Sequence, residues 1–346
     1  MQPLENKEEN PDEMPLSKPP AIEKRSTAWT TVVAAWRRHA RSIGFVVLAA
    51  VTIYGLRELF TGDWTTVIAF WRARLRVLPV IVGLAVLDII LEGVAWVWVV
   101  ERFGMRARDK TGARIYLAAN AGRLLPAQLG RLIRPEEMVR FGRGTTAQCL
   151  KAEGAVFVLD SLSVAALLAG LLVFRINPAL GVLAAAGTIT VALFLGSHIA
   201  DALSDTKLNL PRGFWWNPKT FATTMIQMSG WIAHGLAFYV LVSQLPGSTD
   251  LWDSVFLAPA SAVLGIGSGL PGGVGATEGV LGVSLGLSGV PAAHLAVAIT
   301  GFRVITFWVW IPIGWAALLR IRRKARKAAR KVAASSAPRL GERGPE

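Results

Sequence analysis

GIGSGLPGGVGATEG, residues 265–279, lies in the middle of a long apolar stretch, residues 253–290. Proline and glycine interrupt helices, and backbone groups released from helical bonding at membrane depth need protein or water around them. The stretch therefore predicts a broken or re-entrant helix rather than a simple membrane span. Residues 115–133, IYLAANAGRLLPAQLGRLI, carry a similar interruption at Pro126 and Gly130.

The whole chain has the composition of an integral membrane protein. Its 346 residues are 53% hydrophobic before 34 glycines are counted, and only 17% are charged. These values exclude an intrinsically disordered chain and an ordinary water-soluble enzyme. The single cysteine, Cys149, excludes a disulfide framework and cysteine-rich metal sites. The net charge of +14 does not indicate nucleic-acid binding, because the basic residues flank apolar segments.

We expect an all-α polytopic protein with about six full transmembrane helices and two re-entrant or broken helical elements. An apolar helix of about 20 residues crosses the hydrocarbon core. The predicted spans are residues 43–60, 79–100, 153–174, 180–199, 221–245 and 293–319. The predicted domains are a disordered cytoplasmic arm at 1–27, a transmembrane domain at 28–319 and a basic cytoplasmic tail at 320–346. The tail sequence RIRRKARKAARK is typical of a topology signal or of an anchor on anionic lipid.

The two interruptions share the pattern Leu-Pro-x-x-Leu/Val-Gly, at residues 125–130 and 270–275. With six spans and both termini in the cytoplasm, the first interruption enters from the cytoplasm and the second from outside. Such a pair is typical of an inverted-repeat transporter whose site lies where the breaks meet. Basic loops support this orientation, whereas Arg72, Arg74 and Arg76 would lie outside, against the positive-inside rule.

Charged side chains inside predicted spans are expensive and usually face a cavity or a partner. Asp88 and Glu92 are four residues apart and share one helix face. They fit a role in transport or a structural pair with an arginine, and Glu92 also fits a position near an interface. Asp160 has the same alternatives, with Arg303 as its counter-ion. Glu278 is predicted to pair with an arginine of the first break or to bind a proton, and pairing is favoured.

The first break is surrounded by Arg123, Arg131 and Arg134, next to Gln128. Arginine donates two parallel hydrogen bonds to phosphate, and a restarting helix directs its positive end at an anion. These residues are predicted to contact a lipid phosphate, with surface anchoring of the hairpin as the alternative. The histidines, His234 among them, lack zinc-ligand spacing and are expected to be packing or interfacial residues. We expect no catalytic residues, no metal and no cofactor.

Both interruptions resemble the transmembrane, flippase-type region of lysylphosphatidylglycerol synthases. Residues 270–314 carry the stronger similarity, to a Pro-Gly-Gly-x-Gly-x-x-Glu motif followed by Gly-Val-Pro and an arginine. The matching positions are Pro271, Gly272, Gly273, Gly275, Glu278, Pro291 and Arg303. In the first break they are Asn120, Pro126, Gly130, Arg134 and Pro135. Arg131 replaces the usual glutamate, and Gln128 stands where a basic residue is common.

This resemblance implies movement of anionic, aminoacylated or polyprenyl-linked lipids between the leaflets of a bacterial inner membrane. Only a basic tail follows residue 320. The chain is therefore expected, as a stand-alone member, not to charge a lipid with lysine. The alternative function is a non-transporting scaffold for a separate lipid- or glycan-modifying enzyme. The expected partners are membrane lipids, not nucleic acid, together with a second copy of the chain or that enzyme.

Overall fold

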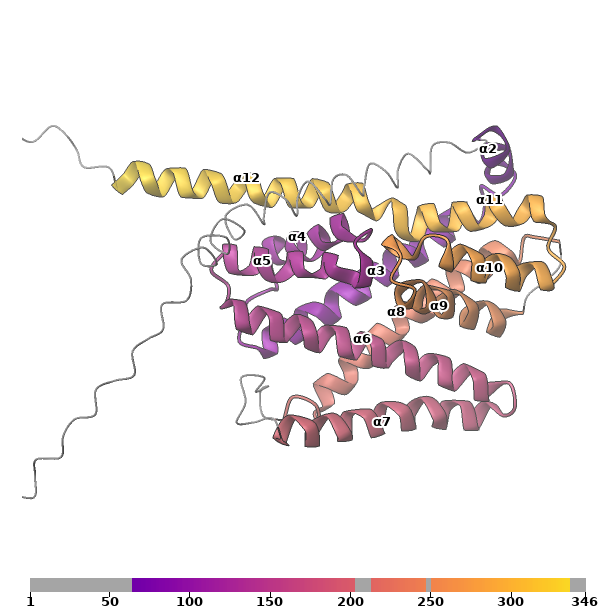
Figure 1. The fold of residues 1–346 in the computed structure, drawn as a ribbon, viewed down its shortest axis with the longest axis horizontal. Helices are drawn as coiled ribbons and strands as arrows, with labels where there is room; N and C mark the ends of the chain where they lie inside the picture. Colours follow the sequence, from indigo (N-terminus) through magenta and orange to yellow (C-terminus); the bar gives the residue numbers. More distant parts are fainter. Residues whose placement is uncertain (1–63, 203–212, 247–249, 337–346) are drawn as a thin grey trace, which may run out of the picture. The chain divides into compact units, whose positions relative to one another are not determined.

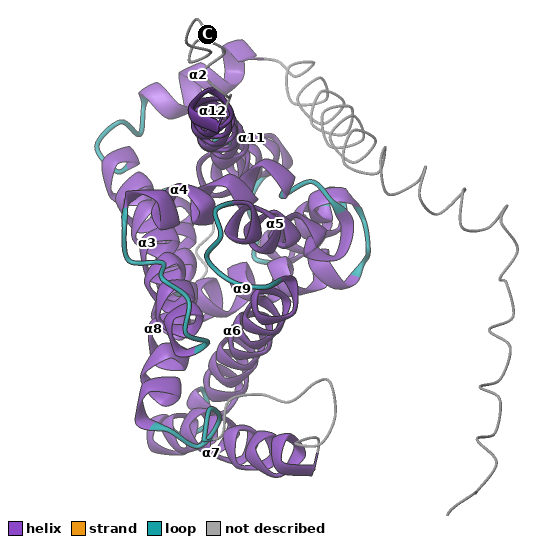
Figure 2. Cartoon of the chain, turned by 90° about the vertical axis from the view of Figure 1, so that its left-hand side faces the viewer, coloured by secondary structure: helices purple, strands orange, loops and turns teal. Residues whose placement is uncertain are grey.

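The computed structural model describes residues 64–202, 213–246 and 250–336. These ranges contain helices and connecting loops and no strand (Figure 2). Five helical stretches within them are long and apolar enough to cross a membrane. They are α3 (Leu78–Arg102), α6 (Thr146–Phe174), α7 (Pro178–Ala202), α8 (Pro218–Val242) and the run His294–Arg326. The chain is thus a membrane protein, and its described part is all-helical.

The last of these stretches is built from three elements. They are α11 (Ala292–Arg303), the π-helical turn η4 (Val304–Trp308) and α12 (Trp310–Ser336). The five stretches coincide with five of the six predicted spans. The sixth, at 43–60, lies outside the described residues, as does the predicted arm at 1–27. Residues 320–336, predicted as a tail, continue α12 as helix (Figure 1).

Shorter helices form the two interrupted elements and an N-terminal segment. The helix α2 (Trp64–Arg72) precedes α3. The first interrupted element consists of α4 (Lys110–Ala118), η1 (Ala119–Gly122), η2 (Pro126–Leu132) and α5 (Ile133–Arg140). The second consists of α9 (Leu251–Gly267), η3 (Pro271–Gly273) and α10 (Ala276–Leu287).

The two interrupted elements start from opposite ends of the long helices. We call the end where α3 finishes and α6 begins the basic end. At this end Arg143 Nη2 lies 2.7 Å from Asp109 Oδ2. This pair joins the residue before α4 to the loop after α5. At the opposite end Arg175, which follows α6, pairs with Asp253 at the start of α9. In Figure 1, α4 and α5 lie toward the left and α10 toward the right. Between the two ends, η2 contacts η3.

Both interruptions have an extended leucine before the proline of their Leu-Pro pair. Leu125 has φ −68° and ψ 138°, and Leu270 has φ −72° and ψ 146°. A residue before proline avoids the α-helical region, so each helix must stop there. Three positions after each leucine, φ is positive, at 57° for Gln128 and 65° for Gly273. Glycine adopts that conformation without strain, whereas glutamine does so at an energetic cost.

Two hydrophobic clusters lie on either side of a polar layer halfway along α3. Ile81 belongs to the cluster near the opposite end, and Trp96 belongs to the cluster near the basic end. Asp88 and Glu92 lie between them on the same helix. The middle of the transmembrane region is therefore where polar side chains meet.

The loop before α4 makes a pH-dependent contribution to stability outside the spans. Hydrogen bonds from Arg143, and from the backbone of the first turn of α4, lower the pKa of the Asp109 carboxyl to about 2. An unfolded aspartate has a pKa of about 3.9. Because the folded pKa is lower, the stabilisation is complete above about pH 4 and is lost as the pH falls toward 2. The melting temperature of Asp109→Asn should therefore be below that of the unchanged protein at pH 6, and the difference should shrink between pH 4 and pH 2. A difference that is constant down to pH 2 would contradict this origin.

Candidate functional site

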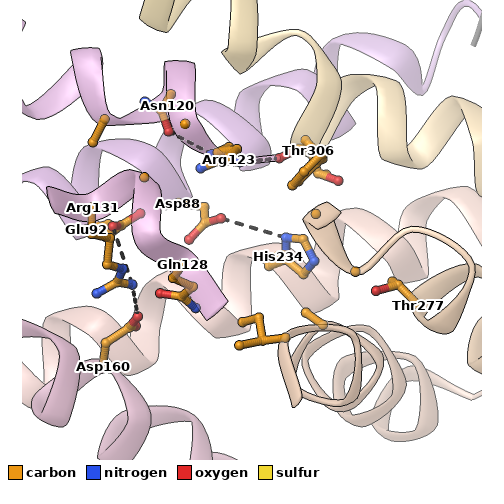
Figure 3. A pocket seen from close by; sticks show the side chains of 18 of the residues that line it. Asp88, Glu92, Asn120, Arg123, Gln128, Arg131, Asp160, His234, Thr277 and Thr306 are labelled. Carbon is orange, nitrogen blue, oxygen red and sulfur yellow. Dashed lines mark hydrogen bonds and ion pairs between the residues drawn. The ribbon is translucent and has the colours of Figure 1, made fainter. Parts of the chain in front are cut away.

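A cavity of about 200 Å³ lies where the two interrupted elements meet the long helices (Figure 3). Its wall is formed by residues of η1, η2, η3, α3, α5, α6, α8, α9, α10, α11 and η4. The acidic and basic residues lining it are Asp88, Glu92, Arg123, Arg131, Arg134, Asp160 and Arg303, together with His234. Gln128, Gly130, Gly272 and Gly273 also line it. Most of the residues singled out from the sequence are thus brought into one place, whereas Glu278, Pro126, Pro271 and Gly275 lie outside the lining.

Arg134 is held between two carboxylates. Its Nη2 lies 3.1 Å from Glu92 Oε1, and its Nη1 lies 3.1 Å from Glu153 Oε1. The indole of Trp96 donates to the other oxygen of Glu153 at 3.1 Å. Only 3% of Arg134 is exposed, and its guanidinium also lies over the Tyr116 ring. Arg134 therefore joins α5 to α3 and α6, because it compensates the buried charges of both.

Arg131 forms the second link between the first break and the spans. It pairs with Asp160, and its Nη2 is 3.9 Å from Glu92 Oε1 (Figure 3). Trp231 donates to Asp160 Oδ1 at 3.1 Å. The prediction that Arg303 is the counter-ion of Asp160 is therefore wrong. The arginine next to Asp160 comes from η2, which packs on α6.

Arg303 instead stabilises the second break. Its Nε donates to Glu278 Oε1 at 2.7 Å, and its Nη2 donates to the carbonyl of Gly272 at 2.8 Å. The other oxygen of Glu278 accepts from the backbone N–H of Gly275 at 2.7 Å. Glu278 is paired as the sequence favoured, but with α11 rather than with an arginine of the first break. The pair holds the turn of η3 and the start of α10 on α11.

Arg123 differs from these three arginines because no carboxylate lies within 4.0 Å of it among the described residues. Its Nε donates to Asn120 Oδ1 at 2.7 Å, and its Nη1 donates to the carbonyl of Thr306 at 3.0 Å. Both partners are neutral. Arg123 therefore lines the cavity as an arginine without a direct ion pair among the described residues (Figure 3).

Asp88 is the lining carboxylate that has no arginine partner in the described ranges. Its Oδ2 lies 3.7 Å from Nδ1 of His234, which reaches the cavity from α8. Helix α8 comes close to Asp88 at Gly230, where an added Cβ would lie 2.9 Å from Asp88 Oδ1. The cavity wall thus contains, within the described ranges, one acidic side chain without an arginine partner, Asp88, and one basic side chain without a carboxylate partner, Arg123. Both can contact a ligand in the cavity.

Sequence reasoning missed Glu153, Gln227 and His234. Glu153 and Asp160 are seven residues apart, which is two helical turns, so they share a face of α6 and the spacing could have revealed the pair. A single glutamine or histidine in an apolar helix carries no such pattern. In the part of the chain that the structure describes, no three His, Cys, Asp or Glu side chains are placed to hold a metal ion.

A comparison with protein-family models matches residues 40–314 to the lysylphosphatidylglycerol synthase TM region. The chain belongs to this family. The match covers all five candidate spans except the last residues of the fifth, and it includes both interrupted elements and the whole cavity. Membership of the lysylphosphatidylglycerol synthase TM region family indicates a membrane role related to lipids. A comparison with curated proteins finds no match.

Proposed function

We propose that the protein translocates a phosphate-bearing lipid between the two leaflets of the membrane. The observation that supports this best is the charged cavity between the two breaks, with Arg123 in its wall bonded only to neutral groups and without a direct ion pair among the described residues. Buried unpaired charge is costly at membrane depth and marks ligand or ion paths. A lipid phosphate would compensate Arg123 by charge-assisted hydrogen bonds.

In the proposed topology the two interrupted elements are re-entrant and form an inverted repeat. Their shared extended leucine before proline, their opposite ends of entry and the contact of η2 with η3 all support this. The basic end faces the cytoplasm of a bacterial inner membrane, as do both termini; the predicted span at 43–60 lies outside the described residues. Basic residues of the loops and of α12 at that end favour this orientation.

The proposed path keeps the acyl chains in the bilayer while the headgroup passes through the cavity. Leu129 of η2 and Leu270 before η3 are 50% and 46% exposed. Leu270 lines the cavity, and Leu129 lies between the lining residues Gln128 and Gly130. Both leucines offer an apolar edge to the acyl chains. Access alternates as the contact between η2 and η3 opens on one side and closes on the other. Arg131 and Arg134 position the first break, and Arg123 contacts the phosphate.

Leaflet exchange in proteoliposomes tests this function. A phospholipid labelled on its headgroup should exchange between leaflets in vesicles that contain the purified protein. Arg123→Gln should slow exchange by about tenfold to a hundredfold, because a hydrogen bond to a charged group contributes about 1.5–3 kcal/mol. Arg123→Lys should retain part of the rate. Arg106→Gln removes the same charge from an exposed loop and should leave the rate unchanged.

The scaffold function predicts a different result. Two observations favour a scaffold. The cavity is smaller than most ligand pockets, which have volumes of roughly 300–1,000 Å³. In addition, carboxylates already pair with Arg131, Arg134 and Arg303. A scaffold gives no exchange in vesicles of any lipid composition, and it co-purifies with a lipid- or glycan-modifying enzyme. Exchange that is equally fast with Arg123→Gln would remove the phosphate role of that residue.

A further inference from the structure

Asp88 and His234 face each other in the cavity wall. Asp88 Oδ2 lies 3.7 Å from His234 Nδ1, and Figure 3 shows the two side chains pointing toward one another. Both residues line the cavity, and their side chains are 27% and 14% exposed. The pair is therefore open to the cavity rather than sealed in the protein core.

The packing of α8 brings His234 to Asp88. Gly230 lies one helical turn before His234 and shares its face, and a Cβ on Gly230 would lie 2.9 Å from Asp88 Oδ1. Glycine thus lets this face of α8 approach α3 closely enough for the imidazole to reach the carboxylate. The imidazole also packs edge-on against Trp231 and Phe302, at centroid distances of 5.9 Å and 5.2 Å. These contacts hold the ring beside Asp88.

Histidine is the side chain suited to gain or lose a proton near neutral pH. The other acidic and basic side chains in the cavity wall are Glu92 of α3, Asp160 of α6, Arg131 of η2, Arg134 of α5, Arg303 of α11 and Arg123, which follows η1. Arginine keeps its charge throughout the range from about pH 5 to pH 8. Glu92 and Asp160 pair with arginines. For Asp88, a proton on His234 is the counter-charge that the described ranges offer.

Other ionisable groups near these helices have partners or positions elsewhere. In the described chain, the lining residues of α8, α9, α10 and η4 include no acidic or basic side chain besides His234. Tyr116 of α4 packs beside α3 and donates to the carbonyl of Ile89 at 3.0 Å. His294 of α11 packs beside Phe70 of α2 and does not line the cavity. Glu278 of α10 pairs with Arg303. Asp88 is therefore the described carboxylate that lies within 4.0 Å of His234.

The charge of this pair decides how the cavity wall meets an anion. With His234 neutral, Asp88 presents its negative charge to the cavity that Arg123 lines, and it repels a phosphate there. With His234 protonated, the two side chains form an ion pair without net charge, and this repulsion is removed. Linkage between two ligands is reciprocal, so an anion that prefers the protonated form also favours proton binding.

We propose that Asp88 and His234 form a proton-binding site in the cavity wall, and that its proton binds together with the lipid anion. The imidazole of His234 takes up the proton, and the carboxylate of Asp88 compensates the charge that results. The identity of the anion rests on the proposed function, with a lipid phosphate at Arg123. The proton is then a co-substrate, which binds and leaves with the headgroup.

Titration calorimetry on the full-length protein in detergent tests the site. The probe is a short-chain phosphatidylglycerol, because its phosphodiester keeps one negative charge between pH 5.5 and pH 8. The unchanged protein should bind it about tenfold more tightly at pH 5.5 than at pH 8, within the usual range of coupling between two sites. In buffers of different ionisation enthalpy at pH 7, binding should take up a fraction of a proton. Equal affinity at both pH values, binding without proton uptake, or no binding at either pH overturns the proposal.

Variants of the two residues should change binding in opposite directions, which misfolding does not do. His234→Gln should bind weakly at both pH values, because Asp88 stays without a counter-charge. Asp88→Asn should bind at pH 8 about as tightly as the unchanged protein does at pH 5.5. The double variant Asp88→Asn, His234→Gln should bind tightly at both pH values. His198→Gln, which removes an exposed histidine of α7, should keep the full pH dependence. A pH dependence that persists in His234→Gln, or weak binding of Asp88→Asn at pH 8, contradicts the assignment.

Leaflet exchange at the two pH values distinguishes failure of this inference from failure of the proposed function. Faster exchange at pH 5.5 that His234→Gln abolishes supports both. Exchange at one rate, together with binding that does not depend on pH, leaves translocation in place and removes the proton site. Binding that depends on pH and takes up protons, without exchange at either pH, leaves the proton site in place and removes translocation.

Discussion

Arg134→Met should lower the free energy of unfolding by about 3–5 kcal/mol, the cost of breaking a buried ion pair from one side. Methionine keeps an unbranched apolar stem but leaves Glu153, which is 5% exposed, without its 3.1 Å partner. Glu92 also loses its nearest arginine atom. Reversible unfolding of the full-length protein in mixed detergent micelles measures the loss.

Two further variants separate this effect from a general loss of charge on α5. Arg140→Met removes an arginine of the same helix whose side chain is 30% exposed and which pairs with Glu136. Arg140 also pairs with the buried Glu137, but Glu137 keeps Arg322 at 2.8 Å, so the expected loss is about 0–1 kcal/mol, as for exposed pairs. The double variant Arg134→Met, Glu153→Met removes both buried charges. It should recover a large part of the lost stability, because Glu92 retains Arg131 at 3.9 Å. Equal losses for Arg134→Met and Arg140→Met would show that the buried pair is not what holds α5.

Helix positions and break positions could be predicted because they depend on local chemistry. Long apolar stretches identify the spans, and the conformational restriction before proline stops the helix at Leu125 and at Leu270. The shared face of Asp88 and Glu92 follows from helical periodicity, and both line the cavity. The helical continuation of α12 to Ser336 was not predicted, because hydropathy marks where a helix leaves the membrane and not where it ends. Alanine, lysine and arginine continue a helix in water.

Which arginine pairs with which carboxylate could not be predicted, because the pairing depends on how the helices rotate and cross. Four arginines and several carboxylates were available, and the sequence offered Arg303 for Asp160. In the structure η2 brings Arg131 to Asp160, while the turn of η3 places Glu278 at Arg303. Glu153 receives Arg134 for the same reason. Tertiary packing determines these pairings, and no periodic pattern in the sequence reveals them.

Gly122→Ala should destabilise the protein by about 1–3 kcal/mol and abolish leaflet exchange, because it overpacks the first break. A Cβ on Gly122 would lie within 3.0 Å of the Gly130 backbone, and a Cβ on Gly130 would meet the Gly122 backbone equally closely. Neither partner is a flexible side chain that can turn away. The two glycines therefore let η1 and η2 approach closely, which places Arg123 and Gln128 on the cavity wall.

Gly187→Ala is the matched control, because Gly187 is in the interior of α7 and an added Cβ there meets nothing within 4 Å. Alanine favours a helix over glycine by up to about 1 kcal/mol, so the control should be unchanged or slightly more stable. Unfolding in micelles and leaflet exchange are measured on both variants. If Gly122→Ala keeps full stability and full exchange, η1 and η2 separate without consequence, and the close contact between them does not set the geometry of the site. If stability falls while exchange persists, the contact is structural and the headgroup does not depend on the first break.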